Sequence, residues 1–195
     1  MSIRLAINGF GRIGRLSFRK IIDDSNFDIV AINDLASPEM IAYLLKYDTV
    51  QGGFHGHSVG FDRNSITVND KRVTIFSESD ASLLPWKESN IDIVLECTGL
   101  YTSREKAESH LRTGAKKVLI SAPAGNDVKT IVYGTNHDIL TPDDKIVSGA
   151  SCTTNCLAPM AKALNDYREL RTGFMTTIHA YTADQMLLDG PQRKG

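Results

Sequence analysis

The stretch Ile3-Arg-Leu-Ala-Ile-Asn-Gly-Phe-Gly-Arg-Ile-Gly14 is the strongest indicator of the fold class of this chain. Its apolar start predicts a strand over Ile3–Asn8, and a helical pattern follows over Ile13–Ile22. Between them, Gly9 permits a tight turn, Gly11 lets the backbone approach a pyrophosphate, and Gly14 allows close packing of the helix on the strand. Three glycines at this spacing, after a strand and opening a helix, predict a dinucleotide-binding unit with the pyrophosphate at the helix N-terminus.

A second strand, expected over Phe27–Asn33, supports this interpretation because an acid follows it directly. Asp34 lies 20 residues after Gly14, where a carboxylate accepts hydrogen bonds from an adenosine ribose. The same negative charge repels a 2′-phosphate, so NAD is favoured over NADP. The alternative is a glycine-rich turn followed by a solvated aspartate.

The chain beyond this unit continues to alternate strands and helices, which predicts an α/β fold with a mainly parallel, doubly wound sheet of the Rossmann type. We expect a nucleotide-binding domain over residues 1–149 and the start of an incomplete α+β catalytic domain over 150–195. The remaining expected elements are helices at Pro38–Tyr47, Ser103–Thr113 and Thr153–Leu170, a hairpin of Ile66–Val68 with Arg72–Phe76, and strands at Ile91–Glu96, Val118–Ser121, Thr130–Tyr133, Lys145–Ser148 and Gly173–Ala180. Residues 181–195 read as irregular, and the chain looks truncated.

Composition is that of a soluble globular protein. The 195 residues are 42% hydrophobic and 23% charged, with a net charge of -1, so nothing points to nucleic acid or an anionic membrane as a partner. No apolar run is long enough to span a bilayer, and the N-terminus does not resemble a signal peptide. The three cysteines are too few for a disulfide framework and fit a reducing cytoplasm.

The segment Ser148-Gly-Ala-Ser-Cys-Thr-Thr-Asn-Cys156 contains the candidate nucleophile. Cys152 falls at the expected start of a helix, where the helix dipole stabilises a thiolate. Ser151 and Thr153 place hydroxyl groups beside free N–H groups, a setting suited to phosphate. Cys156, one turn later, is expected to face inward as a small buried hydrophobe.

A thiol nucleophile needs a base, and His179 is the candidate because it ends an expected strand. From the residues alone, His179 is either that base or a structural histidine with satisfied hydrogen bonds. The other four histidines, His55, His57, His110 and His137, are expected at the surface. The pair His55 and His57 has metal-ligand spacing without a third ligand, so no metal site is predicted.

Six segments together resemble the glyceraldehyde-3-phosphate dehydrogenase family. They are Asn8–Arg15, Asn33–Leu35, Leu45–Asp48, Glu96–Gly99, Ser148–Cys156 and Thr176–Thr182, which occur in the order of that family. The resemblance implies an NAD-dependent oxidation of glyceraldehyde 3-phosphate with inorganic phosphate, giving 1,3-bisphosphoglycerate in cytoplasmic glycolysis. It also implies a homotetramer.

Residue roles follow from this resemblance, position by position. Cys152 would attack the aldehyde and His179 would serve as the base. Ser151 and Thr153 would bind substrate or the attacking phosphate, and Thr182 the phosphate group of the substrate. The cofactor would contact the glycine loop (Gly9, Gly11, Gly14), Arg12, Ile13, Asp34, Thr98 and Ser121.

The chain also departs from the family pattern. Ser79 stands where members often carry a basic residue at the adenine end, and Gly190-Pro191 stands where Leu-Pro is usual. Family chains are nearly twice as long, and the part beyond position 195 supplies further phosphate-binding residues. Three alternatives therefore stay open: an erythrose-4-phosphate dehydrogenase, an NAD-binding fragment without turnover, and a Cys–His acyl-transfer hydrolase in which the glycine loop is accidental.

Overall fold

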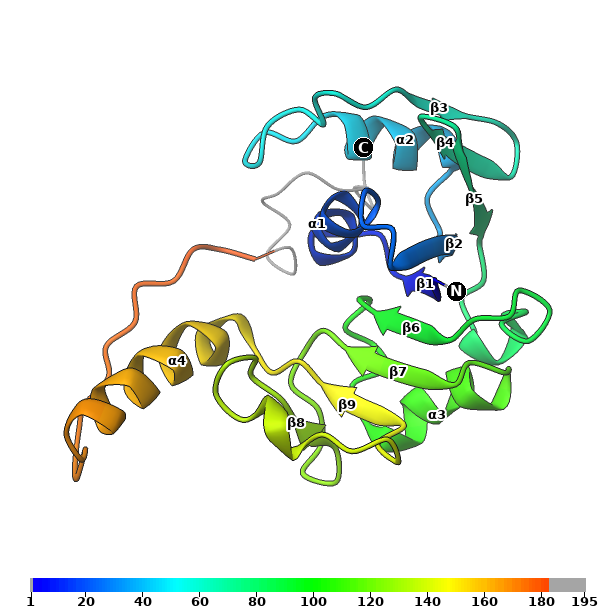
Figure 1. The fold of residues 1–195 in the computed structure, drawn as a ribbon. Helices are drawn as coiled ribbons and strands as arrows, with labels where there is room; N and C mark the ends of the chain where they lie inside the picture. Colours follow the sequence, from blue (N-terminus) through cyan, green and yellow to red (C-terminus); the bar gives the residue numbers. More distant parts are fainter. Residues whose placement is uncertain (1, 183–195) are drawn as a thin grey trace.

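A computed structural model describes residues 2–182 of the chain as a single twisted sheet with helices on both faces and one projecting helix (Figure 1). The strands are β1 (Ile3–Asn8), β2 (Phe27–Asn33), β3 (Val59–Phe61), β4 (Ser65–Val68), β5 (Lys71–Phe76), β6 (Ile93–Glu96), β7 (Lys117–Ile120), β8 (Lys129–Thr130) and β9 (Ile146–Ser148). The helices are α1 (Arg12–Ile21), α2 (Pro38–Lys46), α3 (Arg104–Arg112) and α4 (Cys152–Tyr167), with short 3-10 turns η1 (Ala81–Leu83) and η2 (His137–Ile139).

The strand order shows the double winding of the sheet. The order is β3-β4-β5-β2-β1-β6-β7-β9-β8, and all neighbours are parallel except the β3-β4-β5 meander. The chain starts at the centre, moves outward through β2 and β5, and returns to the other side of β1 for β6, β7 and β9. The predicted α/β class with a mainly parallel sheet is therefore confirmed, and its switch point lies between β1 and β6.

Alternation along the central strands divides the core between the two faces of the sheet. Leu5 and Ile7 of β1 pack in the cluster that contains Phe18 of α1 and Leu45 of α2. Ala6, between them, faces the opposite side with Trp86. Ala6 pairs with Val94, which pairs with Val118, and Val118 packs with Ala107 of α3. Hence α1 and α2 cover one face and α3 covers the other, as right-handed crossovers require.

Helix caps and turn residues in the sequence agree with the observed ends of several helices and strands. Ser37 and Ser103 cap α2 and α3 through their side chains, as small polar residues do at helix starts. In the confirmed β4–β5 hairpin, Asn69 adopts a positive φ of 51°, which asparagine tolerates in a two-residue turn. Strand β3, which the sequence analysis did not predict, is a short and mostly exposed partner of β4.

The predicted strand over Thr130–Tyr133 is wrong beyond its first residue, because β8 ends at Thr130. The side chain of Asn136 folds the following residues into a turn. Its Oδ1 accepts the amide of Val132 at 2.8 Å, and its Nδ2 donates to the carbonyl of Thr130 at 3.0 Å. An Asn side chain that bonds nearby backbone competes with a sheet ladder in this way.

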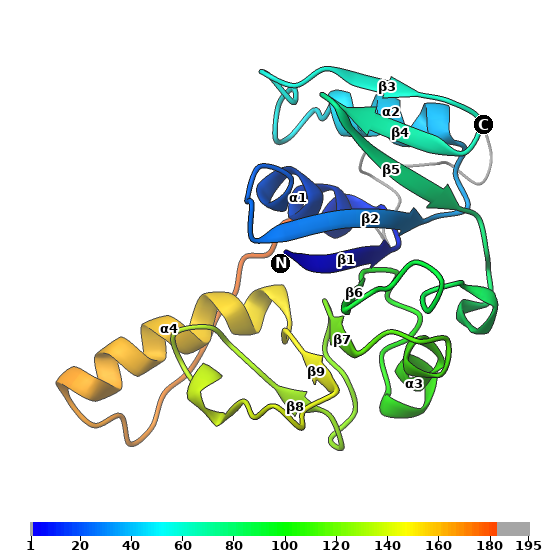
Figure 2. The ribbon, with the colours of Figure 1, turned by 45° about the vertical axis from the view of Figure 1, so that its right-hand side comes forward.

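Helix α4 projects from the sheet, and the segment after it runs back without forming a strand (Figures 1 and 2). The strand predicted over Gly173–Ala180 is therefore wrong, since a strand needs a hydrogen-bonding neighbour and residues 2–182 provide none beside this segment. Cys156, predicted to be buried, is exposed because no element within 2–182 covers that side of α4. Gly190-Pro191 and the rest of 183–195 lie outside the described residues. Within 2–182, no helix combines the length and apolarity needed to cross a membrane.

Candidate functional site

The predicted cofactor residues gather where the central parallel strands end. Gly9 follows β1, Asp34 follows β2, Thr98 lies two residues after β6, and Ser121 follows β7. The carboxyl ends of parallel strands meet at one edge of a sheet, and the switch point between β1 and β6 is the place where doubly wound sheets generally bind their ligands. Cys152 follows β9 at the same edge, so the sheet brings the two candidate sites to one side of the molecule.

The three glycines of the loop differ in what a side chain at each position would meet. Gly9 has a φ of 89°, and a Cβ there would lie 2.7 Å from the amide nitrogen of Thr98. A Cβ on Gly14 would lie 2.2 Å from the carbonyl oxygen of Gly9. A Cβ on Gly11, by contrast, would meet nothing within 4 Å. The loop therefore leaves open space at Gly11, at the helix N-terminus, where a pyrophosphate fits.

The start of α1 is suited to an anion. Gly11 is the N-cap and provides no side-chain hydrogen bond, so the first N–H groups of the helix have no intrahelical acceptor. Arg12 and Ile13 belong to this turn, and the side chain of Ile13 is exposed. The guanidinium of Arg12 forms an ion pair with the carboxylate of Asp48, with Nη1 3.1 Å from Oδ2.

Asp48 is itself firmly held. Its Oδ1 accepts the amides of Val50 and Gln51 at 2.9 and 2.8 Å. Burial alone would raise the pKa of the Asp48 carboxyl, but these two amides and Arg12 together lower it. The pair fixes the side chain of Arg12 beside the glycine loop and leaves its backbone amide for an anion.

Asp34 connects the end of β2 to the glycine loop. Its Oδ2 accepts the amide of Phe10 at 2.7 Å, and its Oδ1 accepts the amide of Ala36 at 2.9 Å. The carboxylate is half-buried, so lone pairs remain accessible for the hydroxyl groups of a ribose. These contacts and the open space at Gly11 fit a dinucleotide with a free 2′-hydroxyl.

Thr98 and Ser121 follow β6 and β7 on the other side of the switch point. The amide of Thr98 donates to Glu96 Oε1 at 2.8 Å, and its hydroxyl donates to the same oxygen. The hydroxyl of Ser121 bonds the thiol of Cys97. Burial is the main reason that the pKa of the Cys97 thiol rises to about 11, so this cysteine stays protonated and unreactive at neutral pH.

Cys152 and His179 are in direct contact, although 27 residues separate them. Sγ of Cys152 lies 3.1 Å from Nε2 of His179. Because Nδ1 of His179 donates to the carbonyl of Ala180, Nε2 is free to accept the thiol proton. The hydrogen bond with His179 lowers the pKa of the Cys152 thiol, and hydrogen bonds with Thr153 lower it further. The pKa of His179 is raised, mainly by its hydrogen bond to the carbonyl of Ala180 and also by the contact with Cys152. Both directions favour a thiolate–imidazolium pair.

Two of the hydroxyl-bearing residues predicted for phosphate, Ser151 and Thr153, flank Cys152 in the sequence. Ser151 caps α4, and its Oγ accepts the amide of Thr154 at 3.0 Å. Thr153 bonds the Cys152 sulfur. Thr182 is exposed at the end of the described segment. Two residues before Cys152, Ala150 adopts a φ of 64°, a left-handed conformation that is strained for a residue with a Cβ.

Two histidines expected at the surface are not solvated there. His110 is fully buried between Trp86 and Glu96, because it lies on the sheet-facing side of α3 with Ala107, a position that i, i+3 spacing could have indicated. His57 pairs with Asp23 at 2.9 Å and stacks on Phe54, so it is largely covered.

Comparison with known proteins assigns the chain to a family. The NAD-binding domain of glyceraldehyde 3-phosphate dehydrogenase matches residues 3–104, and the C-terminal domain of the same enzyme matches residues 151–195. Among curated relatives, glyceraldehyde-3-phosphate dehydrogenase of Clostridium pasteurianum is 58% identical over 98% of this chain and 57% of its own length. The enzymes of Clostridium acetobutylicum and Lactobacillus delbrueckii subsp. bulgaricus are 57% and 56% identical, over 98% and 99% of this chain and 57% and 58% of theirs. The chain thus spans a little over half the length of these relatives, and it belongs to the glyceraldehyde-3-phosphate dehydrogenase family.

Proposed function

We propose that the protein carrying this chain is an NAD-dependent, phosphorylating glyceraldehyde-3-phosphate dehydrogenase. The observation that supports this most is the 3.1 Å contact of Cys152 with His179 at the edge of the sheet that holds the glycine loop. A thiolate beside a dinucleotide cradle suits oxidation of an aldehyde. It does not suit simple hydrolysis, which has no use for a dinucleotide.

The residues of this chain account for the proton and the nucleophile. The Cys152 thiolate forms a C–S bond to the aldehyde carbon as the C=O π bond breaks, and the His179 imidazolium donates its proton to the carbonyl oxygen, giving a thiohemiacetal and a neutral His179. His179 acts as the base for its hydroxyl proton as the hydride leaves, and a thioester on Cys152 results. Attack by inorganic phosphate then breaks the C–S bond, releasing the acyl phosphate and restoring the thiolate. Ser151, Thr153 and Thr182 are the proposed phosphate contacts.

The cofactor site is proposed from the same edge of the sheet. NAD, when bound, accepts the hydride removed from the substrate carbon. Gly9, Gly11, Gly14 and the first turn of α1 (Arg12 and Ile13) would receive the pyrophosphate, and Asp34 the adenosine ribose. Thr98 and Ser121 would line the remaining length of the cofactor.

We also propose the larger organisation of the protein. The proposed boundary divides a nucleotide-binding domain (1–149) from a catalytic domain (from 150). Its position between the end of β9 and the start of α4 supports this proposal. By similarity to the family, the complete protein is a cytoplasmic homotetramer.

The test of the proposed function is NADH formation from glyceraldehyde 3-phosphate, NAD and phosphate by the full-length protein. We expect an absorbance increase that requires phosphate and is lost in Cys152→Ser, while NAD binding is kept. Cys156→Ser is the matched control, because this exposed thiol lies four residues beyond Cys152, the cysteine that bonds His179. Turnover that survives Cys152→Ser, or that does not require phosphate, would contradict the proposal.

A further inference from the structure

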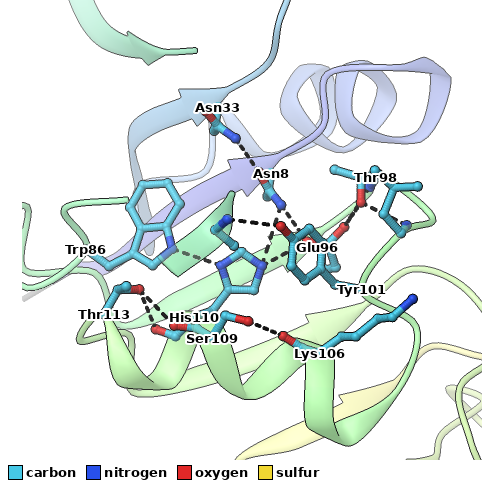
Figure 3. Close-up of polar contacts among 12 residues, drawn as sticks. Asn8, Asn33, Trp86, Glu96, Thr98, Tyr101, Lys106, Ser109, His110 and Thr113 are labelled. Atoms are coloured by element: carbon cyan, nitrogen blue, oxygen red, sulfur yellow. Dashed lines mark hydrogen bonds and ion pairs between the residues drawn. The ribbon is translucent and has the colours of Figure 1, made fainter. Parts of the chain in front are cut away.

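A network of buried polar side chains runs across the carboxyl ends of β6, β1 and β2, next to the predicted cofactor residues in the sequence (Figure 3). It runs from Trp86 through His110, Glu96 and Asn8 to Asn33, and all five side chains are buried. None of the five is among the proposed cofactor-contacting or reacting residues. Burying polar groups costs free energy unless they are fully hydrogen-bonded, so we asked what this network of side chains contributes to structure or function.

The carboxylate of Glu96 is the centre of the network. Its Oε2 accepts Nδ2 of Asn8 at 2.6 Å and Nε2 of His110 at 2.9 Å. Its Oε1 accepts both the amide and the hydroxyl of Thr98. Four donors therefore converge on one group, an arrangement that suits an ionised carboxylate because only that form accepts through all four positions.

The hydrogen-bond donors that surround the Glu96 carboxylate are all uncharged groups. Trp86 donates its indole N–H to Nδ1 of His110 at 3.0 Å. Since an indole nitrogen cannot accept, Nδ1 of His110 carries no proton, and its Nε2–H is the group that donates to Glu96. His110 is therefore a neutral donor, and every other partner is neutral as well.

The network places three cofactor segments relative to one another. Asn8 precedes Gly9, Asn33 precedes Asp34, and Glu96 lies two residues before Thr98. Nδ2 of Asn33 donates to Oδ1 of Asn8 at 2.7 Å and joins β2 to β1. The backbone of Thr98 in turn lies directly against Gly9, where a Cβ would come within 2.7 Å of it.

We propose that Glu96 is a positioning residue for the cofactor, which sets NAD affinity by holding Thr98 against the glycine loop. This inference rests on the proposed function, since it assumes that NAD binds at the carboxyl ends of these strands. Glu96 does not itself touch the cofactor, and it acts through Thr98 and Asn8.

The most direct test is Glu96→Gln, which keeps the shape and replaces one acceptor oxygen with an NH2 donor. The amide oxygen will turn to Asn8 and His110, which are fully buried and cannot find water. The NH2 group then faces the two donors of Thr98 and displaces that segment. We expect NAD to bind about tenfold more weakly by calorimetric titration of the full-length protein, as loss of one or two buried hydrogen bonds implies.

Two further variants separate positioning from general loss of stability. Val118→Ala removes buried core volume on the α3 face without touching the network, so we expect it to lower the unfolding temperature but change NAD affinity less than about twofold. Asn8→Asp combined with Glu96→Gln exchanges donor and acceptor. The carboxylate introduced at position 8 accepts the NH2 group introduced at position 96, and the amide oxygen at position 96 turns back to Thr98. The same carboxylate takes over the Nε2–H of His110, which lies 3.5 Å from Nδ2 of Asn8 in the wild-type protein. This double variant should recover NAD affinity to within about threefold of wild type, and it remains informative if Glu96→Gln alone does not fold.

The outcomes are distinguishable. Unchanged NAD affinity in Glu96→Gln, an equal loss in Val118→Ala, or no recovery in the double variant would each overturn the positioning role while leaving the proposed function intact. Failure of the wild-type protein to bind NAD would overturn both.

Discussion

Sγ of Cys152 lies 3.1 Å from Nε2 of His179, and the carbonyl of Ala180 holds the opposite nitrogen of the same ring. The carbonyl favours a proton on Nδ1, and the thiol supplies a second proton to Nε2. The cysteine comes from the start of a helix and the histidine from the extended segment that returns beside it. This pairing makes the reactivity of Cys152 the first property to measure.

The thiol of Cys152 should react at lower pH than an ordinary thiol. Because His179 lowers the pKa of Cys152 and the thiolate is the reactive form, the iodoacetamide rate should persist as pH falls below the usual thiol range. In His179→Gln the midpoint of this profile should move to higher pH. Site-resolved mass spectrometry measures the rate, with Cys97 as an internal reference that should stay unmodified at neutral pH, since its pKa is about 11. An unchanged midpoint in His179→Gln would show that the contact does not activate the thiol.

Alanine substitutions at two glycines of the loop should affect stability and cofactor binding differently. Gly14→Ala places a Cβ 2.2 Å from the Gly9 carbonyl oxygen and should lower the free energy of unfolding by about 3 kcal/mol. Gly11→Ala meets no atom within 4 Å, so its stability should change by less than about 1 kcal/mol. It should nevertheless bind NAD roughly tenfold more weakly, because the methyl group fills the cradle. Denaturant unfolding and NAD titration of both variants measure this contrast, and full NAD affinity in Gly11→Ala would argue against a pyrophosphate there.

Asp34 should govern both affinity and the choice of cofactor. Asp34→Ala removes the acceptor for the Phe10 amide and for a ribose, so NAD affinity should fall roughly tenfold. It also removes the charge that repels a 2′-phosphate, so the preference for NAD over NADP should narrow. Parallel titrations with the two cofactors test this, and an unchanged ratio would remove Asp34 from the ribose site.

The pair of Arg12 with Asp48 should make stability depend on pH in the acid range. The Asp48 carboxyl has a pKa below 3.8 in the folded protein. Its stabilisation is therefore present above 3.8 and is lost as pH falls through the folded value. Asp48→Asn should reduce the free energy of unfolding at neutral pH by about 1–3 kcal/mol, and the difference from wild type should shrink under acid. Urea unfolding across this range measures the effect. Asp62→Asn, which alters an exposed pair with Arg72, is the control and should change stability far less.

Those parts of the protein that depend on local backbone chemistry could be predicted from the amino-acid sequence. The glycine spacing after β1, the Asn69-Asp70 turn and the serine caps each fix a conformation within a few residues. Alternating strands and helices then leave few topologies. The doubly wound sheet, its switch point and the position of Cys152 at a helix start follow from these short-range rules.

Which distant residues meet became visible only in the folded chain. The contact of His179 with Cys152 joins residues whose spacing predicts nothing. The burial of His110 depends on Trp86 and Glu96, from two other segments, satisfying both ring nitrogens. The segment 173–180 has strand-forming residues but no strand, because sheet hydrogen bonds need a partner that residues 2–182 do not place beside it. In each case the deciding interaction is made by a second segment, so no local pattern could have specified it.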